Sequence, residues 1–123
     1  MTLKPITVVN KTPIKFVLVT MDTHLMSASQ KANYALMREM PNLEFKIHAA
    51  ASWATDAQKL EECRKDIASA DIIMTTMLFL EDHFLPILDD LKKRRDHCDA
   101  MVCVMSAAEV VPLTKIGNFD MSQ

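Results

Sequence analysis

The apolar positions along this chain follow two spacings that alternate, one typical of strands and the other typical of helices. Apolar or alternating runs of strand length lie at residues 14–20, 43–49, 71–80 and 100–105. Between these runs, apolar residues recur every three or four positions, as on a helix with one buried side. The pattern therefore predicts strand followed by helix, repeated along the chain.

The stretch Asp71–His83, DIIMTTMLFLEDH, carries the strongest of these signals. A short apolar run that ends abruptly in Glu81, Asp82 and His83 is typical of a strand buried on both faces. In open α/β sheets, ligands usually bind at the carboxyl ends of such strands. We therefore expect a central strand here, with the three polar residues at the rim of a crevice.

The other segments fit the same scheme. Residues 43–49 alternate between apolar and polar side chains, which predicts an edge strand with one solvent-facing side. Two capping boxes, Thr55–Gln58 and Ser106–Glu109, are predicted to open helices, and Pro112 would shorten or kink the second of these. The basic run 92–95 is expected to be the solvated last turn of the helix that begins near the polar rim.

Alternating strands and helices imply parallel strands joined by right-handed crossovers. We therefore predict a single α/β domain over residues 14–123, preceded by an extended leader at 1–13 that contains Pro5 and Pro13. The expected fold is a flavodoxin-like or Rossmann-like three-layer domain with a mainly parallel sheet of at least four strands, in the order 2-1-3-4. A fifth strand would be expected next, and its absence from the pattern predicts a fragment or a domain completed by another element.

In that strand order, the loops after the first and third strands face each other across a crevice. They would bring Asp22 and His24 together with Glu81, Asp82 and His83. Two imidazoles with carboxylates can bind a divalent metal or transfer protons. Capping of the two following helices is the simpler explanation of the acidic residues. We therefore retain these five as candidates for binding or domain contact, and we assign no catalytic residue and no metal ligand.

Composition narrows the classes of function. The net charge of −2 predicts no strong attraction to nucleic acid or to an anionic membrane. The single glycine, Gly117, argues against a nucleotide site, because Rossmann and P-loop turns need glycines where the backbone approaches phosphate. The chain has three cysteines, no signal peptide and no apolar stretch of about 18 residues. These features indicate a cytoplasmic protein with reduced thiols and no transmembrane segment.

Three blocks of the sequence are together similar to one known family. They are VLVTMDTHL at 17–25, TTMLFLEDHFLPIL at 75–88 and RRDHCDAMVCVMSAAEVVPLTKIGNFDM at 94–121. In this order they resemble the N-terminal domain of the large, porphyrin-binding H subunit of magnesium chelatase, which is related to the large cobaltochelatase subunit. The resemblance covers nearly the whole chain, from about Lys15 to Met121, and no block within it is a catalytic motif.

This resemblance implies a part in chlorophyll or bacteriochlorophyll synthesis. In that family a much longer H subunit binds protoporphyrin IX, and AAA+ and integrin-like partner subunits use ATP hydrolysis to drive insertion of Mg²⁺. The residues that handle porphyrin and metal lie in later domains of the large subunit. The resemblance therefore implies a structural or interaction role for this segment, with no cofactor of its own. It also places the protein in the cytoplasm, or in the plastid stroma of a phototrophic eukaryote.

Two alternatives from other functional classes remain open. A stand-alone flavodoxin-like binding or signalling module would bind a small anion at the crevice. A small metal-dependent or thiol-dependent enzyme would carry stoichiometric zinc or iron, or a reactive cysteine.

Overall fold

The structure is a computed structural model, and it describes residues 14–21, 26–39, 42–116 and 118–121. The predicted leader at 1–13 lies outside the described residues. The strands are β1 (Ile14–Thr20), β2 (Leu43–Ala49), β3 (Ile72–Thr76), β4 (Ala100–Val104), β5 (Lys115–Ile116) and β6 (Phe119–Asp120). The α-helices are α2 (Met26–Glu39), α3 (Ala57–Ser69) and α4 (Glu81–Arg94), and the short 3-10 helices are η2 (Ala50–Ala54) and η3 (Val111–Leu113).

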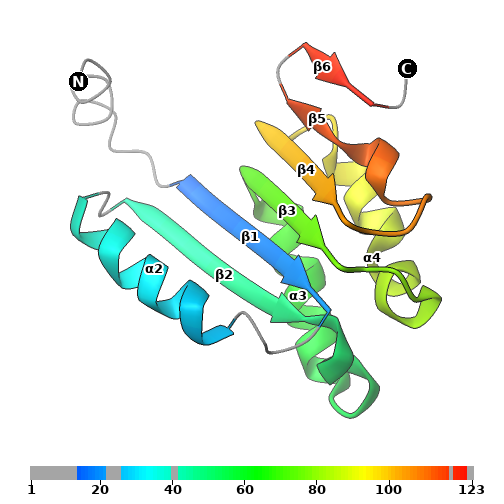
Figure 1. Cartoon of the computed structure of the whole chain (residues 1–123), viewed down its shortest axis with the longest axis horizontal. Helices are drawn as coiled ribbons and strands as arrows, with labels where there is room; N and C mark the ends of the chain where they lie inside the picture. Colours follow the sequence, from blue (N-terminus) through cyan, green and yellow to red (C-terminus); the bar gives the residue numbers. More distant parts are fainter. Residues whose placement is uncertain (1–13, 22–25, 40–41, 117, 122–123) are drawn as a thin grey trace.

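The strands form one sheet in the order β2-β1-β3-β4-β5-β6 (Figure 1). The first four strands are parallel, so the predicted α/β fold and the order 2-1-3-4 are confirmed. The sheet is mixed, however, because β5 and β6 pair antiparallel to their neighbours. The C-terminal residues, for which the sequence predicts no pattern, thus extend the sheet by two short strands.

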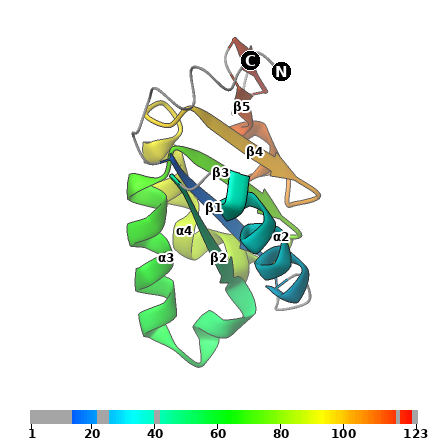
Figure 2. The same ribbon diagram turned by 90° about the vertical axis from the view of Figure 1, so that its left-hand side faces the viewer.

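The core of the domain lies between the sheet and the helices α3 and α4. Figure 2 shows these two helices on one side of the sheet and α2 on the other. Inward-pointing residues of the central strands are fully buried against α3 and α4, among them Val17, Ile73 and Met101 at 0% exposure. Alternate strand residues point to opposite faces, so the central part of this face is dry while the other face depends on what covers it.

The central strand is shorter than its sequence suggests. Residues Ile72–Thr76 lie between β1 and β4, which confirms the central position. The prediction that the strand continues to residue 80 was wrong, because Met77 adopts a left-handed φ of 60° and turns the chain out of the sheet. As a result, Phe79 and Leu80 are 55% and 59% exposed although their sequence is apolar.

The edge position predicted for residues 43–49 is confirmed, since β2 ends the strand order. Glu44 and Lys46 are exposed on its polar side, as alternation predicts. His48 differs, with a side chain only 11% exposed, because it pairs with Asp66 of α3. The polar side of this edge strand is therefore partly covered.

Both predicted capping boxes were wrong. Helix α3 begins one residue later than expected, and its N-cap is Asp56, whose carboxylate accepts a hydrogen bond from the Gln58 backbone N–H at 3.1 Å. The Thr55 hydroxyl instead donates to the Ser52 carbonyl at 3.3 Å. After Ser106 no α-helix follows in the described residues, and the chain forms turns and the short helix η3.

The end of the basic run is not solvated as predicted. Arg94 donates a hydrogen bond to the Ala70 carbonyl at 2.9 Å. The Arg95 side chain, 12% exposed, donates to the Leu113 carbonyl at 2.9 Å and forms an ion pair with Asp120 of β6. These two arginines therefore fasten the end of α4 to neighbouring segments. Among the helices within the described residues, none is both long and apolar enough to cross a membrane.

Candidate functional site

The predicted crevice would lie at the carboxyl ends of β1 and β3. These strands are parallel neighbours, with Val19 opposite Thr75 near the end of the pairing, so the loops that follow them leave the same edge of the sheet. Asp22 and His24 lie outside the described residues. The structure therefore describes only the half of the predicted site that follows β3.

In that half, Glu81 and Asp82 are exposed in the first turn of α4. The N-cap residue of this helix, Leu80, makes no side-chain capping bond, so the two carboxylates supply the negative charge that favours a helix N-terminus. His83 is half-buried, and its Nδ1 atom is buried without a hydrogen-bond partner in the described part of the chain. The three residues form a polar rim, but no hydrogen bond joins them through their side chains within that part.

Two methionines shape the neighbouring turns after β3 and β4. Met77 and Met105 both have left-handed φ angles, 60° and 46°, which are costly for residues other than glycine. The Met77 N–H donates to the Met105 carbonyl at 2.7 Å. The Leu78 N–H donates to the Ser106 hydroxyl at 3.2 Å, and the Ala107 N–H donates to the Leu78 carbonyl at 3.0 Å. Backbone groups of the two turns are thus bonded to each other.

The Ser106 side chain is also occupied, because its hydroxyl donates to the Val104 carbonyl at 2.9 Å. Sequence reasoning missed these turns because left-handed conformations are usually marked by glycine. The one available signal in the sequence was the scarcity of glycine. With so little glycine, other residues must adopt the left-handed conformations of the sharp turns at strand ends. The turns after β3 and β4 are therefore joined by hydrogen bonds, and exposed Phe79 and Leu80 lie next to them, just before the acidic start of α4.

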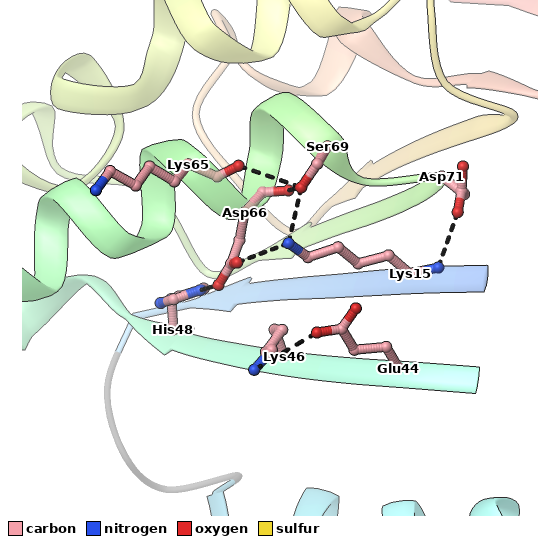
Figure 3. Close-up of polar contacts among 8 residues, drawn as sticks. All are labelled: Lys15, Glu44, Lys46, His48, Lys65, Asp66, Ser69 and Asp71. Atoms are coloured by element: carbon pink, nitrogen blue, oxygen red, sulfur yellow. Dashed lines mark hydrogen bonds and ion pairs between the residues drawn. The ribbon is translucent and has the colours of Figure 1, made fainter. Parts of the chain in front are cut away.

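A second polar cluster, which the sequence analysis missed, joins β1, β2 and α3 (Figure 3). Asp66 lies at its centre: one carboxylate oxygen accepts from Lys15 Nζ at 2.8 Å, and the other lies 2.6 Å from His48 Nε2. Lys15 Nζ also donates to the Ser69 hydroxyl at 2.7 Å. The side chains of Lys15, Asp66 and His48 are 17%, 18% and 11% exposed.

The electrostatics of this cluster favour a charged carboxylate. Burial alone would raise the pKa of Asp66, but the hydrogen bonds and charges of Lys15 and His48 hold that pKa below its ordinary value. Asp66 therefore stays ionised at neutral pH. A carboxylate shared by two cationic or polar donors at hydrogen-bond distance is a strong local tie between three elements.

The cluster opens on a shallow cleft of about 300 Å³ between β2 and α3, lined in part by Lys46, Ser52 and Lys59. An imidazole oriented by a carboxylate can transfer a proton, and nucleophilic catalysis needs a hydroxyl or thiol bonded to that imidazole. In the described residues no hydroxyl or thiol is bonded to His48. The arrangement is therefore best explained as a structural tie.

The three thiols are poorly suited to chemistry. Burial raises the pKa of Cys63 and Cys103, and it also raises the pKa of the half-buried Cys98. All three are free cysteines, and protonated thiols are weak nucleophiles and weak metal ligands. Within the described ranges, no three histidine, cysteine or acidic side chains are placed to hold a metal ion.

Comparison with known proteins identifies a matching family and several relatives of this chain. Residues 15–123 match the family described as Domain of unknown function (DUF3479). The chain is 35% identical over 106 residues to the magnesium-chelatase H subunit of Cereibacter sphaeroides, a match that covers 86% of this chain and 9% of the relative. It is 31% identical over 107 residues to the magnesium-chelatase H subunit of Rhodobacter capsulatus, covering 87% of this chain and 9% of the relative.

A shorter match joins the chain to a plant protein, the chloroplastic magnesium-chelatase ChlH subunit of Oryza sativa subsp. indica. There the identity is 38% over 58 residues, which is 47% of this chain and 4% of the relative. The chain thus spans less than a tenth of the length of the relatives it matches. The two bacterial matches run along most of the chain and confirm the resemblance seen in the three sequence blocks. The chain belongs to the family described as Domain of unknown function (DUF3479), and it is similar to the N-terminal region of the magnesium-chelatase H subunit.

Proposed function

We propose that this chain forms the N-terminal domain of the porphyrin-binding H subunit of a magnesium chelatase. The parent protein, with AAA+ and integrin-like partner subunits, would use ATP hydrolysis to insert Mg²⁺ into protoporphyrin IX, in chlorophyll or bacteriochlorophyll synthesis. It would act in the cytoplasm or the plastid stroma. The observation that carries this proposal is the 35% and 31% identity to two bacterial H subunits over 86% and 87% of the chain.

Within that parent protein the domain acts as a structural and interaction unit. Three features of the described residues support this role. Asp66 holds Lys15 and His48 in one tie. The turns at Met77 and Met105 bond to each other, so the Met77 N–H is not available to a ligand. The thiols are kept protonated by burial. Metal insertion requires a desolvated macrocycle, which a larger enclosed cavity in other domains would supply.

The polar rim is the part of the domain that we propose contacts the remaining domains of the parent protein. Glu81 and Asp82 are exposed there beside the exposed apolar side chains of Phe79 and Leu80. An apolar patch bordered by charge is typical of a contact surface. His83, and by sequence position Asp22 and His24, would complete the same rim.

The test is a porphyrin titration of chain 1–123 beside the parent protein. Quenching of protoporphyrin fluorescence should be tight and saturable with the parent protein, because it contains the cavity-forming domains. With chain 1–123 alone, quenching should be weak and should not saturate. Tight, saturable quenching by chain 1–123 would contradict the proposed division of roles, since the porphyrin site would then lie in this domain.

A further inference from the structure

One face of the sheet carries a continuous apolar row whose exposed end lies on β5 and β6, away from the described helix α2. The strand register places Phe16 opposite Ile72, Ile72 opposite Ala100, Ala100 opposite Ile116, and Ile116 opposite Phe119. Residues paired across neighbouring strands project to the same face of a sheet. The row therefore crosses five strands, from β1 to β6, without a charged residue.

A second row lies beside the first. The register places Leu18 opposite Met74 and Met74 opposite Val102, and Val104 follows two positions along β4 on the same face. We call the part of both rows that lies on β3 to β6 the open face. Its apolar side chains repeat along the strands as well as across them, so they form a surface rather than a line.

Exposure distinguishes the open face from the opposite one. Val104, Ile116 and Phe119 are 37%, 47% and 58% exposed. On the face that packs against α3 and α4, Ile73 and Met101 are 0% exposed although they belong to the same strands as the open face. On the open side the described helix is α2, which packs against the edge strand β2 (Figures 1 and 2).

All-parallel sheets occur almost only where both faces are covered, and the strands β1 to β4 of this mixed sheet are parallel to one another. We infer that the open face docks an amphipathic helix supplied by the same polypeptide from beyond residue 123, next to α2. This inference rests on the proposed function, because the relatives provide the additional chain: the present chain corresponds to 9% of each bacterial relative.

The dimensions of the open face fit a helix. β3 and β4 have five residues each, a length of about 16 Å, which a helix of about eleven residues would match. In the first row the small side chain of Ala100 lies between the larger Ile72 and Ile116. Helix α2, about 10 Å in diameter, lies on the same side of the sheet against β2, so a second copy of the sheet would have to clear α2 on both partners.

Thiol labelling of introduced cysteines measures whether the open face is covered. Val104→Cys and Ile116→Cys place thiols on it, and Lys65→Cys places one on the exposed side of α3 as a matched control. Each variant is made in chain 1–123 and in the parent protein and treated with a maleimide reagent. The unmutated proteins give the background from the native cysteines.

We expect the thiols at 104 and 116 to react at least about tenfold more slowly in the parent protein than in chain 1–123, because buried thiols are inert. The control at 65 should react at similar rates in both proteins. Equal rates at 104 and 116 in the two proteins would overturn the inference. So would slow labelling in chain 1–123 that reverses on dilution, because a second copy would then cover the face.

The magnesium-insertion activity of the same preparations separates this inference from the proposed function. An active parent protein with fast-reacting thiols at 104 and 116 would refute the docked helix and leave the function standing. An inactive parent with protected thiols would support the docked helix and count against the function.

Discussion

Asp66 is the residue at which three elements of the domain converge. Its carboxylate joins Lys15 of β1 and His48 of β2 to helix α3 at distances of 2.8 and 2.6 Å. Both partners are largely shielded from solvent, at 17% and 11% exposure, so this tie is worth more than an ordinary surface ion pair. At the level of single residues, it is the contact that fixes the edge of the sheet against its helix layer.

The Asp66→Asn variant should lower the free energy of unfolding by about 2 kcal/mol at neutral pH, because Lys15 and His48 lose their shared charged acceptor. The pKa of Asp66 is depressed in the folded state, below an unfolded value of about 3.9. The stabilisation is therefore fully present above that value and is lost as the pH falls through the folded-state pKa. Urea unfolding at about pH 7 and about pH 3 measures both effects.

The matched control is Glu62→Gln, an exposed acidic residue on the same helix, which should change stability by less than about 0.5 kcal/mol. A deficit for Asp66→Asn that stays constant between the two pH values would contradict the ionic account of the cluster.

Sequence reasoning could not find this cluster, because residues 15, 48 and 66 come together only through strand register and helix packing. The one local signal was His48 on the polar side of an alternating strand. The candidate rim could be predicted more directly, since the carboxyl end of a strand is a position that the fold itself marks. Of these candidates, Glu81, Asp82 and His83 lie at the start of α4, which follows β3, and Asp22 and His24 lie outside the described residues.

At the scale of elements, the backbone conformation of the turns after β3 and β4 determines where each strand ends. Both strands stop at a methionine with a left-handed backbone, and the two turns are joined by the Met77 to Met105 hydrogen bond. Residue preferences do not mark these positions, so the predicted third strand was too long. The strands at 14–20 and 43–49 were predicted with the observed bounds, because apolar runs and alternation continue through to their ends.

Replacing Met105 tests the strain at the exit of β4. Its side chain is 68% exposed, so Met105→Ala and Met105→Gly remove nearly the same contacts. Only glycine relieves the left-handed conformation, and the glycine variant should be the more stable of the two by about 1 kcal/mol. Thermal and urea unfolding of both variants measure the difference. An alanine variant as stable as the glycine variant would show that the turn is not strained.

The two wrong capping predictions show that tertiary contacts can override a local sequence pattern. Thr55 and Ser106 both have the residue spacing of a capping box, yet Asp56 caps α3 and the Ser106 hydroxyl bonds the turn after β3. At the start of α3, the neighbouring acidic residue Asp56 takes the capping position in place of Thr55. At Ser106, the nearby turn after β3 takes up the hydroxyl group. Such competition depends on neighbours in space, which spacing along the chain does not reveal.

At the scale of the whole molecule, the strand order 2-1-3-4 followed from alternating strands and helices, because right-handed crossovers leave few arrangements. The β5–β6 pair could not be predicted, since two-residue strands have no periodicity. Arg95 and Asp120 hold this pair to the end of α4. Within the described residues, the molecule is therefore a mixed sheet with α3 and α4 on one side and α2 on the other.

A domain exchange tests the proposed function most directly. Residues 14–123 replace the matching segment of the magnesium-chelatase H subunit from Cereibacter sphaeroides, and formation of Mg-protoporphyrin is measured with the partner subunits, ATP and Mg²⁺. An unrelated flavodoxin-like domain of similar size in the same position is the control. We expect ATP-dependent magnesium insertion at a rate close to that of the native protein, and loss of it in the control. A chimera that folds and binds porphyrin but inserts no magnesium would contradict the proposed function.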